Sequence, residues 1–306
     1  MRAICIRHYG GPEVLELVDT PQPVPVSGQV LIRVEAAAVN PADGKWRDGM
    51  FARIMPDALP MIPGYDIAGI VAKTCPNGPP AGTRVAAMLD PVSKGGYAEF
   101  AVAPIDALAI IPDTLGLDQA AAAPTAGLTG LQIAERVANV QPGQTILVTG
   151  ALGMVGRIAL HYASKRGAKV VAAVRQESGQ AARDAGADAV IVLDENPPAD
   201  MLFDHVLDTV GGPDVANLCR QLQTGGSIVT VATTPIEGPD LPAEPQFYGV
   251  ENNGTDLTRI LADMAKGELV IPVELTLPLE QAATAQSMVD AGKREGKIIL
   301  LPQRPA

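Results

Sequence analysis

The fold is decided by the stretch Thr145-Ile-Leu-Val-Thr-Gly-Ala-Leu-Gly-Met-Val-Gly156. Its first five residues are apolar or β-branched, as is typical of a buried strand. A helix-prone segment, Arg157-Ile-Ala-Leu-His-Tyr-Ala, follows the last glycine. Glycines at the junction permit a tight turn and let backbone N–H groups approach a phosphate, which the helix N-terminus favours. The stretch therefore predicts a dinucleotide-binding turn.

Strands and helices continue to alternate beyond this turn. The segments 169–174, 189–193, 203–208 and 227–232 read as short buried strands, and helices are expected over 154–165 and around 178–185. Short apolar strands separated by helices are typical of a doubly wound parallel sheet. We therefore expect an α/β protein with a Rossmann-type sheet.

The regions on either side of this alternation have a different composition and hydrophobic pattern. Residues 1 to about 118 form brief strand-like runs between Gly and Pro, such as Val30-Leu-Ile-Arg-Val-Glu-Ala, which indicates a partly closed β-rich domain. An Ala-rich segment from Asp118 to Glu135 is helix-prone despite Pro124. After a Pro-rich loop, helices are expected over 255–266 and 279–291 and a final strand over 298–301.

The end of the second Rossmann strand indicates which dinucleotide binds. NAD sites carry an Asp or Glu there, which accepts hydrogen bonds from the ribose hydroxyls. Here the strand ends in Ala173-Val-Arg175-Gln176, without a carboxylate. The guanidinium of Arg175 can form a bidentate hydrogen-bonded pair with a 2′-phosphate. The hydroxyl of Ser178 can donate a further hydrogen bond to it. The sequence therefore predicts NADPH, unless Arg175 is simply a solvated residue at a strand end.

Composition and charge narrow the function classes. The 306 residues suffice for two domains, and the net charge of -11 argues against an intrinsic grip on nucleic acid. No apolar run approaches the roughly 20 residues that span a bilayer, and the chain opens directly into a strand-like alternation. The three Cys and three His are scattered without metal-binding spacing. We expect a cytoplasmic protein without a bound metal.

Several motifs together resemble the medium-chain dehydrogenase/reductase superfamily, specifically its zinc-free quinone oxidoreductase and enoyl reductase branch. They cover almost the whole chain and include Gly11-Pro-Glu-Val-Leu, Val39-Asn-Pro-Ala-Asp, Pro63-Gly-Tyr-Asp-Ile-Ala-Gly, Gly95-Gly-Tyr-Ala-Glu-Phe, Ala123-Pro-Thr-Ala-Gly-Leu-Thr, Asp208-Thr-Val-Gly-Gly and Gly296-Lys-Ile-Ile-Leu. The resemblance implies a split GroES-like catalytic domain over 1–118 and 255–306 and a Rossmann NADPH-binding domain over 119–254. It also implies a homodimer formed through a strand near 246–251.

The resemblance further implies the site residues. The cofactor would contact Thr125, Thr129, Gly150, Ala151, Leu152, Gly153, Met154, Val155, Gly156, Arg175, Ser178, Val210, Val231, Ala232 and Thr233. Zinc-dependent relatives carry a Cys where this chain has Asn40, and a His-Glu pair where it has Tyr65-Asp66. At most one carboxylate ligand remains, too few to hold zinc. The resemblance thus implies a reaction without a metal.

Without a metal, the protein is left with positioning and hydrogen bonds to the charge that develops on oxygen. Quinones and α,β-unsaturated carbonyls spread that charge, so they are the favoured acceptors. Asn40 is expected to offer an amide donor, or else to cap the turn before Pro41. Tyr65 is expected to donate a hydrogen bond or proton, or else to pack behind the site. Lys45, Trp46 and Arg47 are expected at the substrate end, where Trp46 can stack on an aromatic acceptor and Lys45 or Arg47 can attract an acidic substrate. Otherwise they form a solvent-facing charged loop in which Trp46 fills a gap.

Two alternatives stay open at this stage. One is a pathway-specific enone or enoyl reductase whose quinone activity is incidental, although Met50-Phe51 stands where some enoyl reductases carry a proton-donating Tyr. The other is a non-catalytic NADPH-binding protein, such as a redox sensor or a structural protein, because a fold alone does not fix function.

Overall fold

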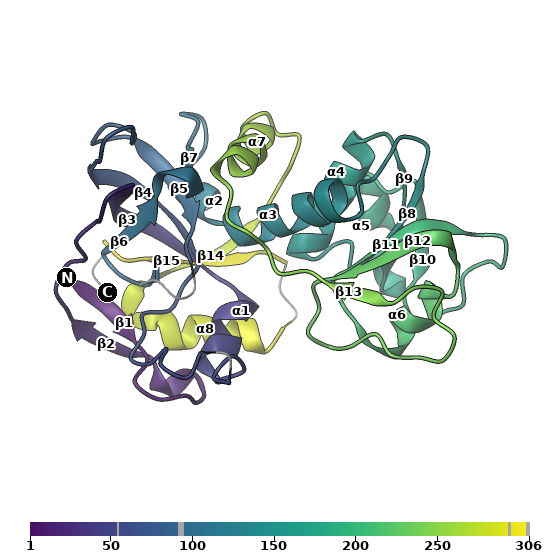
Figure 1. Ribbon diagram of the computed structural model, residues 1–306, viewed down its shortest axis with the longest axis horizontal. Helices are drawn as coiled ribbons and strands as arrows, with labels where there is room; N and C mark the ends of the chain where they lie inside the picture. Colours follow the sequence, from purple (N-terminus) through teal and green to yellow (C-terminus); the bar gives the residue numbers. More distant parts are fainter. Residues whose placement is uncertain (54, 91–94, 293–294, 304–306) are drawn as a thin grey trace. The chain divides into compact units, whose positions relative to one another are not determined.

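The computed structural model describes residues 1–53, 55–90, 95–292 and 295–303. They form two compact units, one made of Met1–Thr125 with Asn252–Ala306 and the other of Ala126–Glu251. The expected fold class is confirmed, since one unit is a β-rich domain and the other carries a parallel Rossmann-type sheet (Figure 1).

The second unit is built on a six-stranded sheet in the order β10-β9-β8-β11-β12-β13, with every neighbouring pair parallel. Its strands are β8 (Thr145–Thr149), β9 (Lys169–Val174), β10 (Ala189–Val192), β11 (Phe203–Asp208), β12 (Leu222–Thr230) and β13 (Pro245–Phe247). Its helices α4 (Met154–Lys165) and α5 (Gly179–Asp184) lie on one face, and α6 (Gly212–Cys219) lies on the other (Figure 1). This order reverses direction after β8, where β11 pairs on its other side, as in dinucleotide-binding sheets.

The first unit is built on a seven-stranded sheet in the order β14-β15-β3-β4-β5-β7, with β6 paired to β3. The strands are β3 (Gln29–Val39), β4 (Asp66–Lys73), β5 (Arg84–Met88), β6 (Phe100–Pro104), β7 (Leu108–Ile110), β14 (Val273–Pro278) and β15 (Lys297–Leu301). A small antiparallel pair, β1 (Arg2–Cys5) and β2 (Glu16–Asp19), accompanies it. The helices are α1 (Pro41–Arg47), α2 (Leu117–Ala121), α7 (Gly254–Ala265) and α8 (Ala282–Asp290).

Each unit has its own apolar core. In the first, Ile32, Val34, Ile67 and Leu300 come from neighbouring strands and are completely buried. In the second, the completely buried core residues include Leu147, Phe203, Val206 and Ile228. Buried strands of this kind are the continuous apolar runs recognisable in the sequence.

The Ala-rich segment does not form one helix. It divides into α2, which ends at Ala121, and α3 (Pro124–Gln132), which continues as a π-helix over Ile133–Val137. Pro124 lacks a backbone N–H and restricts the residue before it, so it interrupts one helix and begins the next. The segment is therefore helical, as expected, and Pro124 divides it into two helices.

Candidate active site

The glycine turn in the second unit has the geometry that a dinucleotide phosphate requires. Gly150 adopts a φ of 59°, in the left-handed region that favours glycine. A Cβ added to Gly156 would lie 2.1 Å from the carbonyl oxygen of Gly150, so no larger residue fits there. The α4 helix begins after Gly153 without a side-chain cap, which leaves its first N–H groups directed at the turn. These features fit a pyrophosphate bound against backbone.

The two residues expected to read the cofactor's 2′-phosphate lie at the end of β9. Arg175 is exposed and directly follows the last residue of the strand. The N–H of Ser178 donates to the carbonyl of Arg175 at 2.9 Å and closes a short 3-10 turn. Both residues thus lie beside the end of β9, and their contact with the 2′-phosphate stays a prediction.

The carboxylate of Asp208 ties together the ends of three neighbouring strands. It accepts hydrogen bonds from the hydroxyls of Thr149 at 2.5 Å and Thr230 at 2.6 Å, and from the N–H groups of Val210 and Gly211 at 3.0 Å. The backbone positions expected to complete the cofactor site, Val210, Val231, Ala232 and Thr233, follow directly from β11 and β12. Asp208 was not singled out as a site residue from the sequence, although it opens the motif Asp208-Thr-Val-Gly-Gly and ends an apolar strand.

In the first unit, Asn40 occupies the N-cap of α1 and is buried. Its side chain does not cap the helix: Nδ2 donates to Oδ2 of Asp66 at 3.0 Å, and Oδ1 accepts from the ammonium of Lys297. The cap contact runs in the other direction, from the Asn40 N–H to Oδ2 of Asp43 at 2.7 Å. The amide is therefore fixed between a buried acid and a buried base.

Asp66 accepts hydrogen bonds on both of its oxygens. Its Oδ1 accepts from Thr125, whose N–H lies at 2.9 Å and whose hydroxyl lies at 2.5 Å, and its Oδ2 accepts from Asn40. Burial raises the pKa of Asp66, while the nearby ammonium of Lys297 acts to lower it. Thr125, expected beside the cofactor ribose, thus holds Asp66. Thr129 lies buried further along α3.

Asp43 is buried one turn into α1. Its Oδ2 accepts from the N–H of Asn40 and, at 2.8 Å, from the hydroxyl of the buried Tyr97. Oδ1 has no hydrogen-bond partner among the residues that the structure describes. Burial raises the pKa of Asp43 to about 7.

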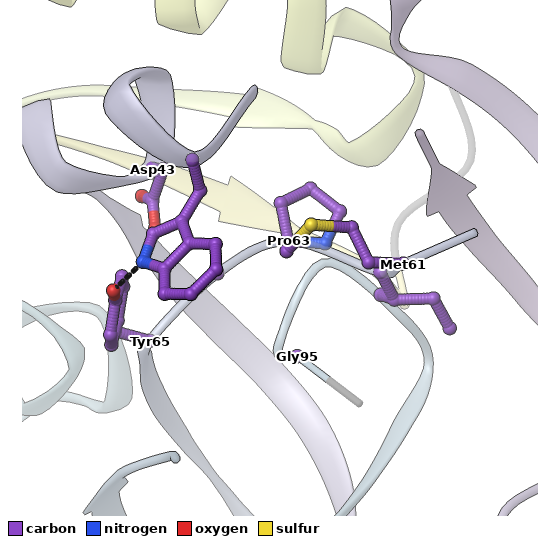
Figure 2. Close-up of a pocket in the computed structure, with 8 residues that line it drawn as sticks. Asp43, Met61, Pro63, Tyr65 and Gly95 are labelled. Carbon is purple, nitrogen blue, oxygen red and sulfur yellow. Dashed lines mark hydrogen bonds between the residues drawn. The ribbon is translucent and has the colours of Figure 1, made fainter. Parts of the chain in front are cut away.

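Tyr65 and Trp46 meet at a small cavity (Figure 2). The indole N–H of Trp46 donates to the hydroxyl oxygen of Tyr65. Burial, and next the charge of Asp43, raise the pKa of Tyr65 far above its ordinary value. The phenol is therefore neutral at physiological pH and retains its own O–H for donation.

The three residues expected to face the substrate have different environments. Lys45 is half-buried, and burial lowers the pKa of its ammonium. Trp46 is only 6% exposed, packs on Phe51 at 4.7 Å between ring centroids, and so fills a gap instead of presenting a free face.

The expectation that Arg47 attracts an acidic substrate requires correction. Arg47 is 2% exposed, and its guanidinium donates to the carbonyl of Gly10 and to the side chains of Asp48, Gln286 and Asp290. Its donors are committed to the protein, because α8 brings Gln286 and Asp290 against α1. We therefore assign Arg47 a structural role.

The sequence did not single out Asp43, Tyr97 and Lys297 as site residues. They come from α1, from the segment before β6 and from the start of β15. Only the fold brings Lys297 to the Asn40 amide and Tyr97 to the Asp43 carboxyl. The motifs around 39–43 and 296–300 carried a signal, but no pairing between them was readable. Among the described residues, no group of three or more His, Cys, Asp and Glu side chains is arranged to hold a metal ion, and no helix is long and apolar enough to cross a membrane.

Two family models match the chain. Residues 26–113 match the alcohol dehydrogenase GroES-like domain, and residues 185–300 match the model described as zinc-binding dehydrogenase. Among curated proteins, mouse quinone oxidoreductase is 31% identical over 98% of this chain and 98% of its own length. An Arabidopsis thaliana protein described as a chloroplastic NADPH-dependent alkenal/one oxidoreductase is 30% identical over 99% of this chain and 80% of its own length.

Solved structures agree with these sequence matches. The quinone oxidoreductase from Coxiella burnetii has a TM-score of 0.87 at 29% identity, with 99% of both chains covered. A structure described as an NAD-dependent alcohol dehydrogenase has a TM-score of 0.87 at 28% identity, covering 98% of this chain and 99% of its own. A mycobacterial protein solved in complex with NADPH has a TM-score of 0.81 at 28% identity, covering 99% of this chain and all of its own.

Proposed function

Since the chain belongs to the medium-chain dehydrogenase/reductase superfamily, alongside its quinone oxidoreductases, we propose that it is a zinc-independent reductase that transfers hydride from NADPH to a quinone or an α,β-unsaturated carbonyl compound. The superfamily's oxidoreductases use a nicotinamide cofactor. The choice of NADPH, the absence of zinc and the acceptor class are the parts that we propose.

The bonding of Asn40 carries the metal-free part of this proposal. At the position where zinc-dependent relatives have a thiolate, the Asn40 amide is bound between Asp66 and Lys297. Both Asp66 oxygens already accept hydrogen bonds, and a buried ammonium stands beside them. Zinc needs deprotonated ligands with free lone pairs converging on one point. This donor set does not fit zinc, so we derive no step through a metal.

The glycine turn and the end of β9 support NADPH. The turn admits a pyrophosphate because Gly156 leaves the Gly150 carbonyl uncrowded, and Arg175 supplies a charge for the 2′-phosphate. When bound, NADPH supplies the hydride. The relationship to the Arabidopsis alkenal/one oxidoreductase supports the enone half of the acceptor class.

Tyr65 is proposed as the group that assists the developing oxyanion. Its hydroxyl accepts from Trp46 and keeps its proton, so it can donate to a substrate oxygen. Asn40 is proposed to assist through the second N–H of its amide, because the bond to Asp66 uses one of the two. Conjugated acceptors need only such weak assistance, because their charge is delocalised.

The cofactor claim is tested by measuring dissociation constants for NADPH and NADH by calorimetry. Arg175→Ala is expected to weaken NADPH about tenfold or more while leaving NADH nearly unchanged, since a charge-assisted hydrogen bond contributes about 1.5–3 kcal/mol. Arg183→Ala, on the neighbouring α5 and also exposed, is the matched control. Equal affinity for both cofactors in the unsubstituted protein would contradict the proposal.

The acceptor claim is tested by NADPH consumption with naphthoquinones, linear enals and aryl enones, compared with simple ketones. We expect turnover with the first three and little with ketones, and no change after dialysis against a chelator. Tight NADPH binding without turnover on any acceptor would favour a redox sensor.

A homodimer is a further part of this proposal. The strand β13 lies at the edge of the parallel sheet, and Phe247 at its end is 61% exposed. An open edge with an apolar side chain favours pairing with a second copy. Light scattering at micromolar concentration is expected to give twice the monomer mass, which Phe247→Lys should halve.

A further inference from the structure

The cavity beside Tyr65 is large enough for one ordered water. The volume open to the centre of a water molecule is about 10 Å³, which is the lower limit for holding a single water. Its wall is polar on one side and apolar on the other, as Figure 2 shows, and is formed by Asp43, Trp46, Met61, Ile62, Pro63, Gly64, Tyr65 and Gly95.

One oxygen on the polar side of the cavity has no hydrogen-bond donor among the described residues. Oδ1 of Asp43 is buried and has no hydrogen-bond partner among the described residues, although Oδ2 of the same carboxyl has two. An unpaired buried oxygen is costly, and ordered water commonly satisfies such atoms. Asp43 is 1% exposed, so bulk solvent does not satisfy this oxygen directly.

The hydroxyl of Tyr65 offers the second partner. Its oxygen accepts one hydrogen bond from Trp46, and a phenol oxygen can accept another while donating its own proton. Asp43 and Tyr65 line the same cavity, and the charge of Asp43 acts on Tyr65. The two groups are therefore placed to share one water.

We propose that this cavity holds one water linking Oδ1 of Asp43 to the Tyr65 hydroxyl, and that Asp43 resupplies the proton that Tyr65 gives to the reduced substrate. This inference rests on the proposed function. In each turnover, Tyr65 gives its proton to the substrate oxygen after hydride arrives. The resulting phenolate takes a proton from the water, and the water takes one from the carboxylic acid of Asp43. Asp43 then regains a proton from solvent.

The surroundings of Asp43 suit this role. Burial raises its pKa to about 7, so that a substantial fraction carries the proton at neutral pH. Asp66 on β4 raises this pKa further, whereas Lys297 on β15 and the hydrogen bonds from Tyr97 and Asn40 lower it. A donor with a pKa near the working pH is the most effective kind.

A direct test uses Trp46, the only tryptophan of the chain, as a reporter in the protein without cofactor. Its indole donates to Tyr65, so its fluorescence should titrate with a midpoint near pH 7. Asp43→Asn should abolish this titration, because the amide accepts the same hydrogen bonds without ionising. Asp57→Asn, an exposed acid, should preserve it. An unchanged midpoint in Asp43→Asn would overturn the proposal.

The second test follows turnover with pH. The unsubstituted enzyme should slow as pH rises through about 7, since Asp43 loses its proton. Asp43→Asn should be slower by about tenfold or more at pH 6, with a flat profile and unchanged NADPH affinity. A variant with unaltered rate and profile would overturn the relay. Absence of turnover in every protein, with a fluorescence titration that still depends on Asp43, would overturn the proposed function and the relay's catalytic role together.

Folding of the variant is checked separately. Circular dichroism and thermal unfolding of Asp43→Asn distinguish loss of the relay from loss of structure. Tyr65→Phe supplies a second variant that removes only a hydroxyl. It should slow turnover at least as much as Asp43→Asn, and the double variant should be no slower than Tyr65→Phe alone, because both residues serve one proton path. Additive losses would overturn the shared path.

Discussion

Nζ of Lys297 lies 3.9 Å from Oδ2 of Asp66, and both side chains are almost completely buried. Burial lowers the pKa of the lysine and raises that of the aspartate, while the attraction between the two groups opposes both shifts. The pair and Asn40 form a compact polar group inside a β-rich domain.

Breaking this pair should be costly. Lys297→Met leaves Asp66 buried without its cation and should lower the free energy of unfolding by about 3–5 kcal/mol. Urea denaturation followed by circular dichroism measures this. The double variant Lys297→Met with Asp66→Asn should recover much of the loss, because it leaves no unpaired charge. If the double variant were less stable than the single one, the ion pair would not be the cause.

Stability should depend on pH through Asp43. Its folded-state pKa of about 7 lies above the ordinary value of 3.8, so its stabilising contribution is complete below pH 4 and is lost as pH rises through 7. Asp43→Asn should therefore become more stable relative to the unsubstituted protein by about 2 kcal/mol between pH 5.5 and 8. Urea unfolding at both pH values measures the difference. A constant difference would show that Asp43 keeps an ordinary pKa.

The glycine turn should not tolerate a side chain. A Cβ at Gly156 would lie 2.1 Å from the Gly150 carbonyl oxygen, so Gly156→Ala must displace the backbone. We expect a loss of at least 2 kcal/mol in unfolding free energy and NADPH binding too weak to measure by calorimetry. Gly238→Ala, where a Cβ would meet only the Cβ of Ala216 at an ordinary 3.5 Å, is the control and should change neither quantity.

Arg47 should matter for stability and not for substrate affinity. Arg47→Met removes hydrogen bonds to Gly10, Gln286 and Asp290 and should lower the unfolding free energy by about 2–3 kcal/mol. Arg53→Met removes an exposed charge from the segment that follows α1 and should have little effect. A selective rise in KM for acidic acceptors, without loss of stability, would instead restore Arg47 to the substrate site.

The sequence predicted what local patterns encode. The strand, glycine turn and α4 helix lie within 21 residues of one another, from Thr145 to Lys165, and the helix was predicted with the bounds that the structure has. The segment around Pro124 was predicted only to be helix-prone, because alanine has a strong helix propensity. The break itself follows from the missing N–H of Pro124.

The hydrogen-bond partners of Asn40 and Arg47 could not be predicted from local sequence patterns. Lys297 lies 257 residues from Asn40, and Gln286 lies 239 residues from Arg47. Charged residues are usually exposed to solvent. The burial of Arg47 and Lys297 follows only from the packing of α8 and β15 in the folded domain. Long-range contacts, not local propensity, decide which charges are buried.

The hydrogen bonds of Asp208 affect how the second unit, which carries the Rossmann-type sheet, binds its ligand. Because one carboxylate fastens Thr149, Thr230 and the N–H groups after β11, these strand ends are ordered before any ligand arrives. Little conformational entropy then remains to be lost there when a dinucleotide binds. The second unit is therefore preorganised for its ligand, because Asp208 holds the ends of β8, β11 and β12 in one conformation.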